Sequence, residues 1–213
     1  MLKISNFEVM GWEHAIRGMR NPMNSWAKSD SLWNGAFNYS NGTPVWSIGD
    51  NDLDLMKRLR NAGTDHRKFM RMITVYLDIT APLYWWKEFD TYKIGTVANS
   101  CSTMHKIAAK RFERDDFSHE HLMDGGNYIL NSTIDMLNEY RAQYLDSEDK
   151  KYWWQMIQLL PSSYNQKRTV MLNYEVLANI YKSRRNHKLD EWHTFCNWIE
   201  ELPYSELITG YEE

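Results

Sequence analysis

The segment Met70–Ile79, with the sequence MRMITVYLDI, constrains the fold more than any other part of the chain. From residue 73 onward every second residue is aliphatic, so these side chains lie on one face of an extended backbone. β-Branched residues are also enriched, as strands prefer. The segment therefore predicts a strand whose shared face carries Ile73, Val75, Leu77 and Ile79. Ala81 and Pro82 predict its end, because proline suits the first turn of a following helix.

The rest of the front half alternates between shorter predicted elements. LKISNFEV (2–9) predicts a strand, GWEHAIRGMR (11–20) a short helix, and GDNDLDLMKRLRNAG (49–63) a helix that Asp50 or Asn51 caps and Gly63 stops. Residues 83–92 are expected to be helical, the small-polar run 96–103 to break regular structure, and MHKIAAKRFE (104–113) to resume helix. Between these, residues 21–49 predict a long irregular segment of the kind that often carries function.

The back half carries apolar residues at helical spacing. Helices are expected over 128–145, 147–160, 169–186 and 190–202, with Ser147 and acidic residues opening the second and Pro161 ending it. A strand-containing front half and a helical C-terminal half predict an α+β fold. The length of 213 residues fits a single domain over 1–213.

Composition narrows the class of protein. Hydrophobic residues make up 43% and aromatic residues 14%, enough to bury a substantial core. A net charge of −3 argues against a general nucleic-acid binder, which needs clustered positive charge. No apolar run reaches the roughly 18–20 residues of a membrane span, and the N-terminus lacks a signal-peptide core. Cys101 and Cys196 form no disulfide framework. We therefore expect a cytoplasmic protein with no nucleic-acid partner and no membrane contact.

Common catalytic motifs are absent. The sequence has no GxGxxG, GxxxxGK[ST], GxSxG or HExxH. His119, His121 and Asp124 lie in a predicted loop without a clear third and fourth ligand, so no metal site is expected. Cys101 and His105 are one helical turn apart, but no third group is in place to orient the histidine. The two YWW triplets (84–86, 152–154) suit either base or flavin stacking or, more commonly, the core.

Two polar constellations are more informative. TDHRKFMR (64–71) is either a polar turn or an anion site at the start of the strand, with Arg71 as its best candidate. On a predicted helix, Asn173, Asn179 and Arg184 follow at steps of six and five residues. At 100° per residue Asn173 and Arg184 lie about 20° apart, so they share a face, which is either solvated or functional.

The order of these features resembles the flavin-dependent thymidylate synthase (ThyX) family over residues 60–195. That family has a strand ending in Ala-Pro, an aromatic helix, a small-polar loop, a Leu-Pro, and then Asn, Asn and Arg. Pro161 stands twelve residues before Asn173, and Asn179 and Arg184 follow at the family's own steps.

The front motif departs from the family in charge. Glu88 stands where the family has Gln, and the family's Arg-His-Arg is Thr91-Tyr92-Lys93 here. Thr96 replaces a Ser, Asn99 and Ser102 persist, and the family's Glu and last Arg are missing. A charge-assisted hydrogen bond contributes about 1.5–3 kcal/mol, so unreplaced arginines would weaken phosphate binding severely. Lys93, His105 and Lys106 are near enough in sequence to substitute.

The resemblance implies an antiparallel sheet with flanking helices, a homotetramer, and reductive methylation of dUMP or a related pyrimidine nucleotide. FAD would be the cofactor, with NADPH and methylenetetrahydrofolate as co-substrates. Arg184 would be the catalytic residue that holds the uracil ring. The implied substrate-binding residues are Glu88, Lys93, Ser102, His105, Lys106 and Arg184, and the implied cofactor-binding residues are Arg71, Tyr92, Lys93, Asn99, Asn173 and Asn179.

Two hypotheses stay open at this point. In the first the protein is a ThyX-like enzyme, which the retained Asn173, Asn179 and Arg184 favour. In the second it is a catalytically inactive ThyX-fold protein that binds nucleotides or partners, which the missing Arg-His-Arg favours.

Overall fold

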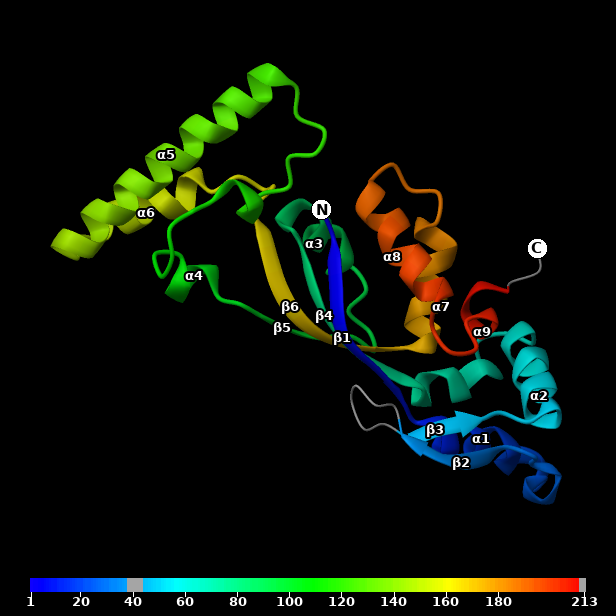
Figure 1. Cartoon of the computed structure of the whole chain (residues 1–213). Helices are drawn as coiled ribbons and strands as arrows, with labels where there is room; N and C mark the ends of the chain where they lie inside the picture. The colour runs from blue at the N-terminus through cyan, green and yellow to red at the C-terminus, as the bar shows by residue number, and fades with distance from the viewer. Residues whose placement is uncertain (38–43, 211–213) are drawn as a thin grey trace. The chain divides into compact units, whose positions relative to one another are not determined.

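The computed structural model describes residues 1–37 and 44–210 (Figure 1). Their fold is mixed α and β. An antiparallel four-stranded sheet has the strand order β1-β4-β6-β5, and flanking helices accompany it. The four strands are β1 (Lys3–Met10), β4 (Thr74–Pro82), β5 (Val97–Ser100) and β6 (Asn165–Asn173). A separate antiparallel hairpin pairs β2 (Leu32–Phe37) with β3 (Pro44–Ser47). The α+β prediction is confirmed.

The chain divides into two compact units. The first unit consists of Met1–Lys3, Ile79–Thr91 and Asn99–Thr169; the second consists of Ile4–Asp78, Tyr92–Ala98 and Val170–Glu213. Each strand of the four-stranded sheet contributes residues to both units. The expectation of a single domain over 1–213 stays a prediction.

The first unit holds four α-helices: α3 (Leu83–Phe89), α4 (Thr103–Lys106), α5 (Asp124–Ser147) and α6 (Lys150–Leu159). A short 3-10 helix, η4 (Arg114–Asp116), precedes α5. On α3, Trp85, Trp86 and Phe89 are fully buried; the rings of Trp85 and Phe89 stack, and Trp86 meets both of them edge to face. Helices α5 and α6 pack together around an apolar cluster that includes Leu137 and Met156. The unit therefore rests on aromatic and aliphatic packing, as the composition predicts.

The second unit holds the remaining helices: α1 (Trp12–Arg20), α2 (Asp50–Asn61), α7 (Tyr174–Arg184), α8 (Asp190–Glu200) and α9 (Glu206–Thr209). Three 3-10 helices join them: η1 (Asn21–Met23), η2 (Trp26–Lys28) and η3 (Arg67–Met72). Ile73, Val75 and Leu77 are buried in this unit and Ile79 in the first, which confirms the predicted face of β4. Within residues 1–37 and 44–210, no helix combines the length and apolar character that crossing a bilayer requires.

Several sequence-based boundaries are wrong. Residues 169–173 form the end of β6 rather than the start of a helix, because the alternating Val170 and Leu172 are both buried in the sheet. Val97–Ser100 forms β5, where a break was expected. The helix predicted over 104–113 extends only to Lys106. In each case pairing or packing with distant residues overrides local propensity.

The segment 21–49 is less irregular than predicted, since it contains η1, η2 and the β2–β3 hairpin. Residues 38–43 of this segment lie outside the described residues. The cap of α2 also differs from expectation. The N-cap residue is Gly49, and the carboxylate of Asp30 accepts hydrogen bonds from the backbone N–H groups of Asn51 and Asp52 at 2.9 and 3.1 Å. A side chain outside the helix thus satisfies its first N–H groups.

Candidate functional site

The loop Tyr92–Ala98 lies along helix α7 within the second unit. At one end, the Tyr92 hydroxyl accepts a hydrogen bond of 3.0 Å from Nε of Arg184, in the last turn of α7. At the other end, a Cβ on Gly95 would meet Nδ2 of Asn173 at 2.9 Å and Cγ2 of Val176 at 3.2 Å. An eleven-residue helix is about 16 Å long, so the loop contacts both ends of it. Gly95 has φ +77°, which favours glycine at this close approach.

Arg184 is held between two aromatic rings. Its guanidinium carbon lies 4.9 Å from the centroid of the Trp192 ring and 5.7 Å from that of Tyr92. Trp192, on α8, is fully buried and meets Tyr92 edge to face at 6.2 Å. The rings attract the cation and, with the Tyr92 hydroxyl, fix the plane of the guanidinium. The sequence predicted Arg184 and Tyr92, but gave no signal for Trp192 because it reads as an ordinary core residue.

Asn173 is an N-cap, not a helix residue. Its backbone is extended (φ −130°, ψ 169°) and its side-chain oxygen accepts a hydrogen bond of 3.1 Å from the N–H of Val176. The helical-wheel argument that placed Asn173 and Arg184 on one face is therefore wrong, since α7 begins at Tyr174. The loop 92–98 is what connects the two residues. Asn179 is exposed on α7.

An ion-pair cluster stands beside the start of α7. Glu175 accepts hydrogen bonds from Nε and Nη2 of Arg71 and, at 3.1 Å, from Nε of Arg67. Burial raises the pKa of the Glu175 carboxyl, but hydrogen bonds from Arg71 and Arg67 outweigh burial and hold the pKa below its ordinary value. Two guanidinium groups therefore share one carboxylate, and Asp65 also interacts electrostatically with Arg71. Arg71, predicted at the start of the strand, lies in η3, and its side chain is 52% exposed.

The loop itself carries an unsatisfied polar group. Oγ1 of Thr96 is buried and has no hydrogen-bond partner within the described part of the chain. A buried hydroxyl without a partner is uncommon in a folded protein and indicates a missing ligand or water. Beside it Lys93 is exposed, and Ile94 is 93% exposed. Thr96 was matched to a family serine by the sequence but not named as a site residue.

The remaining predicted residues belong to the first unit. Ser102 caps α4, and its Oγ accepts a hydrogen bond of 3.1 Å from the N–H of His105. His105, Lys106 and Asn99 are exposed, and Glu88 is partly buried on α3.

Nucleophilic catalysis by a cysteine–histidine pair and metal binding gain no support from the described residues. Within the described residues no hydrogen bond joins the Cys101 thiol and the His105 ring. No group of three His, Cys, Asp or Glu in residues 1–37 and 44–210 is placed to hold a metal ion. The His119 ring instead contacts the carbonyl of Phe117 at 2.8 Å.

The comparison with solved structures supplies the fold. ThyX from Helicobacter pylori, complexed with FAD and dUMP, superposes with a TM-score of 0.68 at 15% identity, over 97% of each chain. The chain has a ThyX-like fold. A second ThyX structure from Helicobacter pylori with FAD and dUMP gives the same TM-score and identity over 98% of this chain and 97% of that one.

A third structural neighbour is a UMP/dUMP methylase, PolB from Streptomyces cacaoi, bound to 5-bromo-UMP. It superposes with a TM-score of 0.63 at 13% identity, over 99% of this chain and 95% of that chain. No family model and no curated protein matches the sequence.

Proposed function

We propose that this protein is a flavin-dependent enzyme of the ThyX type that reductively methylates dUMP or a related pyrimidine nucleotide. The observation that carries the proposal is Arg184, which Tyr92 and Trp192 hold against the loop 92–98. A fixed guanidinium can meet a uracil carbonyl and stabilise negative charge that develops on the ring. That two neighbours are ThyX enzymes with dUMP and a third is a UMP/dUMP methylase supports this substrate class.

The residues of the second unit fit a bound flavin. The Thr96 hydroxyl lacks a partner within the described residues, and Arg71 is half exposed beside α7, where its guanidinium can donate to a diphosphate. As FAD-binding residues we propose Arg71, Tyr92, Lys93, Asn99, Asn173 and Asn179, all of the second unit except Asn99. When bound, the reduced flavin supplies the hydride and methylenetetrahydrofolate the carbon, with NADPH as the reductant that is consumed.

For the nucleotide, we place Arg184 as the catalytic residue, at the pyrimidine ring. Lys93, Ser102, His105 and Lys106 would bind the phosphate, and Glu88 the sugar or base. Each charge-assisted hydrogen bond contributes about 1.5–3 kcal/mol, so two lysines can replace part of what two lost arginines supplied. We further propose a single functional domain over 1–213 that assembles as a cytoplasmic homotetramer.

The test begins with an absorbance spectrum of freshly purified protein, with released cofactor identified by mass. Bound FAD is expected. The protein is then incubated with dUMP or UMP, methylenetetrahydrofolate, NADPH and FAD, and the methylated nucleotide is measured by mass spectrometry.

Arg184→Ala should lower product formation at least 100-fold, because removing one hydrogen-bond donor to a transition state typically lowers the rate about 10²–10³-fold. The melting temperature of this variant should stay close to that of the wild type. Lys182→Ala is the matched control, because Lys182 is an exposed cation on the same helix. Equal loss in both variants, or none in Arg184→Ala, would refute the catalytic assignment.

The second candidate function is nucleotide binding without catalysis. Two observations favour it: Thr91 and Lys93 stand where the family carries arginines, and Glu175 neutralises part of the charge of Arg71. A colourless protein that takes up no FAD, yet binds dUMP or UMP in calorimetry, would establish this function in place of the first.

A further inference from the structure

A cavity apart from the loop 92–98 and α7 is lined, within the second unit, by residues of α1 and by Trp26, Ser29, Ser31 and Trp46. Its volume is about 310 Å³, at the lower end of small-molecule sites. Ile16, Arg17 and Arg20 of α1 line it on one side. Trp26, Ser31 and Trp46 line it from the segment whose role the sequence left open. None of its lining residues belongs to the site proposed for nucleotide and flavin.

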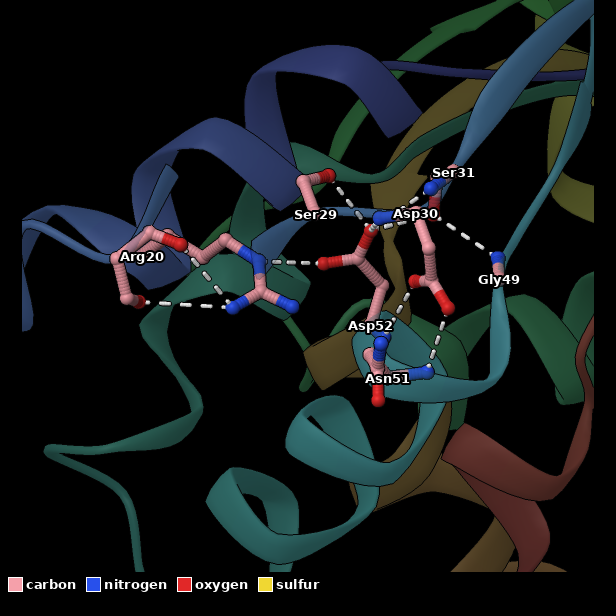
Figure 2. A network of polar contacts seen from close by, with 8 residues as sticks. Arg20, Ser29, Asp30, Ser31, Gly49, Asn51 and Asp52 are labelled. Atoms are coloured by element: carbon pink, nitrogen blue, oxygen red, sulfur yellow. Dashed lines mark hydrogen bonds and ion pairs between the residues drawn. The ribbon is translucent and has the colours of Figure 1, made fainter. Parts of the chain in front are cut away.

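The base of this cavity carries a buried guanidinium. Arg20 is 4% exposed, donates from Nε to Oδ1 of Asp52 at 2.6 Å and from Nη1 to the carbonyl of Ser25 at 3.3 Å. Its third nitrogen, Nη2, has no acceptor within residues 1–37 and 44–210, and Figure 2 shows it without a dashed line. Nη2 is not among the fully buried unsatisfied side-chain nitrogens of the described residues, so it opens onto the cavity, where its N–H groups can donate to a ligand atom that accepts a hydrogen bond.

The electrostatics of the cavity suit a ligand that accepts a hydrogen bond, whether that ligand is neutral or negatively charged. Asp52 compensates the charge of Arg20, and the Ser29 and Ser31 hydroxyls are already donating to Asp52 at 2.7 Å each. At its rim, Arg17 is 60% exposed and lies 3.7 Å from the carboxylate of Glu13. A carbonyl or a carboxylate oxygen therefore suits Nη2 equally well.

The walls favour a flat ring. Two of the lining residues are tryptophans, and the indole of Trp26 is fixed by a hydrogen bond of 2.8 Å from Nε1 to Oδ1 of Asn21. Ile16 adds a buried aliphatic surface. Indole faces stack on planar aromatic and heteroaromatic rings, and such contacts tolerate many ring types.

We propose that this cavity binds a small planar aromatic or heteroaromatic molecule whose carbonyl or carboxylate oxygen accepts a hydrogen bond from Nη2 of Arg20, while its ring contacts Trp26 and Trp46. The segment 21–49 then has a definite role, since it supplies both indoles. This ligand is separate from the nucleotide, flavin and folate of the proposed reaction.

The test is ligand-observed NMR on the full chain with three probes: benzoate, benzamide and cyclohexanecarboxylate. Benzoate and benzamide share the flat ring and the acceptor, whereas cyclohexanecarboxylate keeps the acceptor and lacks the flat ring. We expect the first two to bind with millimolar or tighter affinity and the third at least tenfold more weakly, a difference of about 1.4 kcal/mol.

The variant Trp26→Ala should weaken benzoate about tenfold, within the range of stacking contributions. Trp26 is 49% exposed, so its removal leaves the core intact. The control is Trp154→Ala, which removes a tryptophan that is 44% exposed on α6, in the first unit. The proposal is overturned if neither benzoate nor benzamide binds at millimolar concentration. It is also overturned if benzoate binds the wild type and the Trp26 variant with equal affinity.

Discussion

Replacing Asp52 by Asn tests the polar network that joins α1, α2 and the segment between them (Figure 2). Asp52 is fully buried, and its Oδ1 accepts from Arg20. Its Oδ2 accepts from the hydroxyls of Ser29 and Ser31 and from the backbone N–H groups of Asp30 and Ser31, at 2.7–3.2 Å. Asparagine keeps the shape, removes the charge, and turns one acceptor into a donor that faces other donors.

The expected cost follows from burial. Removing one partner of a buried ion pair leaves the other charge uncompensated and typically costs 3–5 kcal/mol, about 4 kcal/mol here. For a chain of about this length each kcal/mol shifts the melting temperature by about 2–4 °C, so Asp52→Asn should melt roughly 10 °C below the wild type. The cost of leaving Arg20 buried and unpaired dominates, because its side chain is only 4% exposed.

Asp54→Asn is the control, measured beside it by differential scanning calorimetry at pH 7. It makes the same charge change on the same helix, but the pair of Asp54 and Arg58 (2.9 Å) is 67–68% exposed. Exposed pairs contribute about 0–1 kcal/mol, so this variant should melt within about 3 °C of the wild type. If the two variants melt at the same temperature, the network does not stabilise the fold in the way argued.

Two further predictions concern the candidate site. Burial raises the pKa of Glu175, but hydrogen bonds from Arg71 and Arg67 lower it, and the pKa in the folded protein is below its ordinary value. The ionised Glu175 therefore stabilises the fold fully above its pKa in the unfolded chain, about 4.3. This stabilisation is lost as the pH falls through the lower pKa of the folded protein. In urea unfolding, Glu175→Gln should have a much lower free energy of unfolding than the wild type at pH 7, and this difference should shrink below about pH 4. A difference that is the same at both pH values would contradict this. Gly95→Ala should lower the free energy of unfolding by about 1–3 kcal/mol, because the new methyl group strains the positive-φ backbone and clashes with α7. Gly63→Ala is the control, since Gly63 shares the positive φ but has open space around it, and its loss should be smaller. Equal losses in the two variants would argue against close packing of the loop.

Much of the fold follows from periodicity alone. The alternating residues of β4 needed no tertiary information, and their predicted face is the buried one. The helix α2 was also predicted from its sequence, but its cap depends on Asp30, which lies outside the helix. Strand β6 was missed because the run from Val170 to Ala178 is nearly all apolar and suits a strand or a helix equally. Only pairing with β4 and β5 decides where the strand ends and α7 begins, at the Asn173 cap.

The site was predictable only in part, for a related reason. Spacing identified Arg184 and Asn173, but the residues that hold them come from far along the chain. Tyr92 and Arg184 are hydrogen-bonded although they lie 92 residues apart in the sequence, and Arg67 and Glu175 lie 108 residues apart. One signal was available: Glu175 lies two residues after Asn173 and is an acid within a largely apolar run, which called for a basic partner such as those in TDHRKFMR.

Tyr92 gives this end of the loop a group that orients Arg184. Its hydroxyl accepts a hydrogen bond from Nε of Arg184, and its ring adds an aromatic face to the one that Trp192 provides. Tyr92 therefore orients a charge that is already present and adds none of its own. Under the proposed function, recognition of the nucleotide therefore depends less on its phosphate and more on the pyrimidine ring, whose carbonyl must meet a guanidinium with little freedom to adjust. Such a site discriminates by geometry, since a fixed donor leaves a displaced acceptor unpaired.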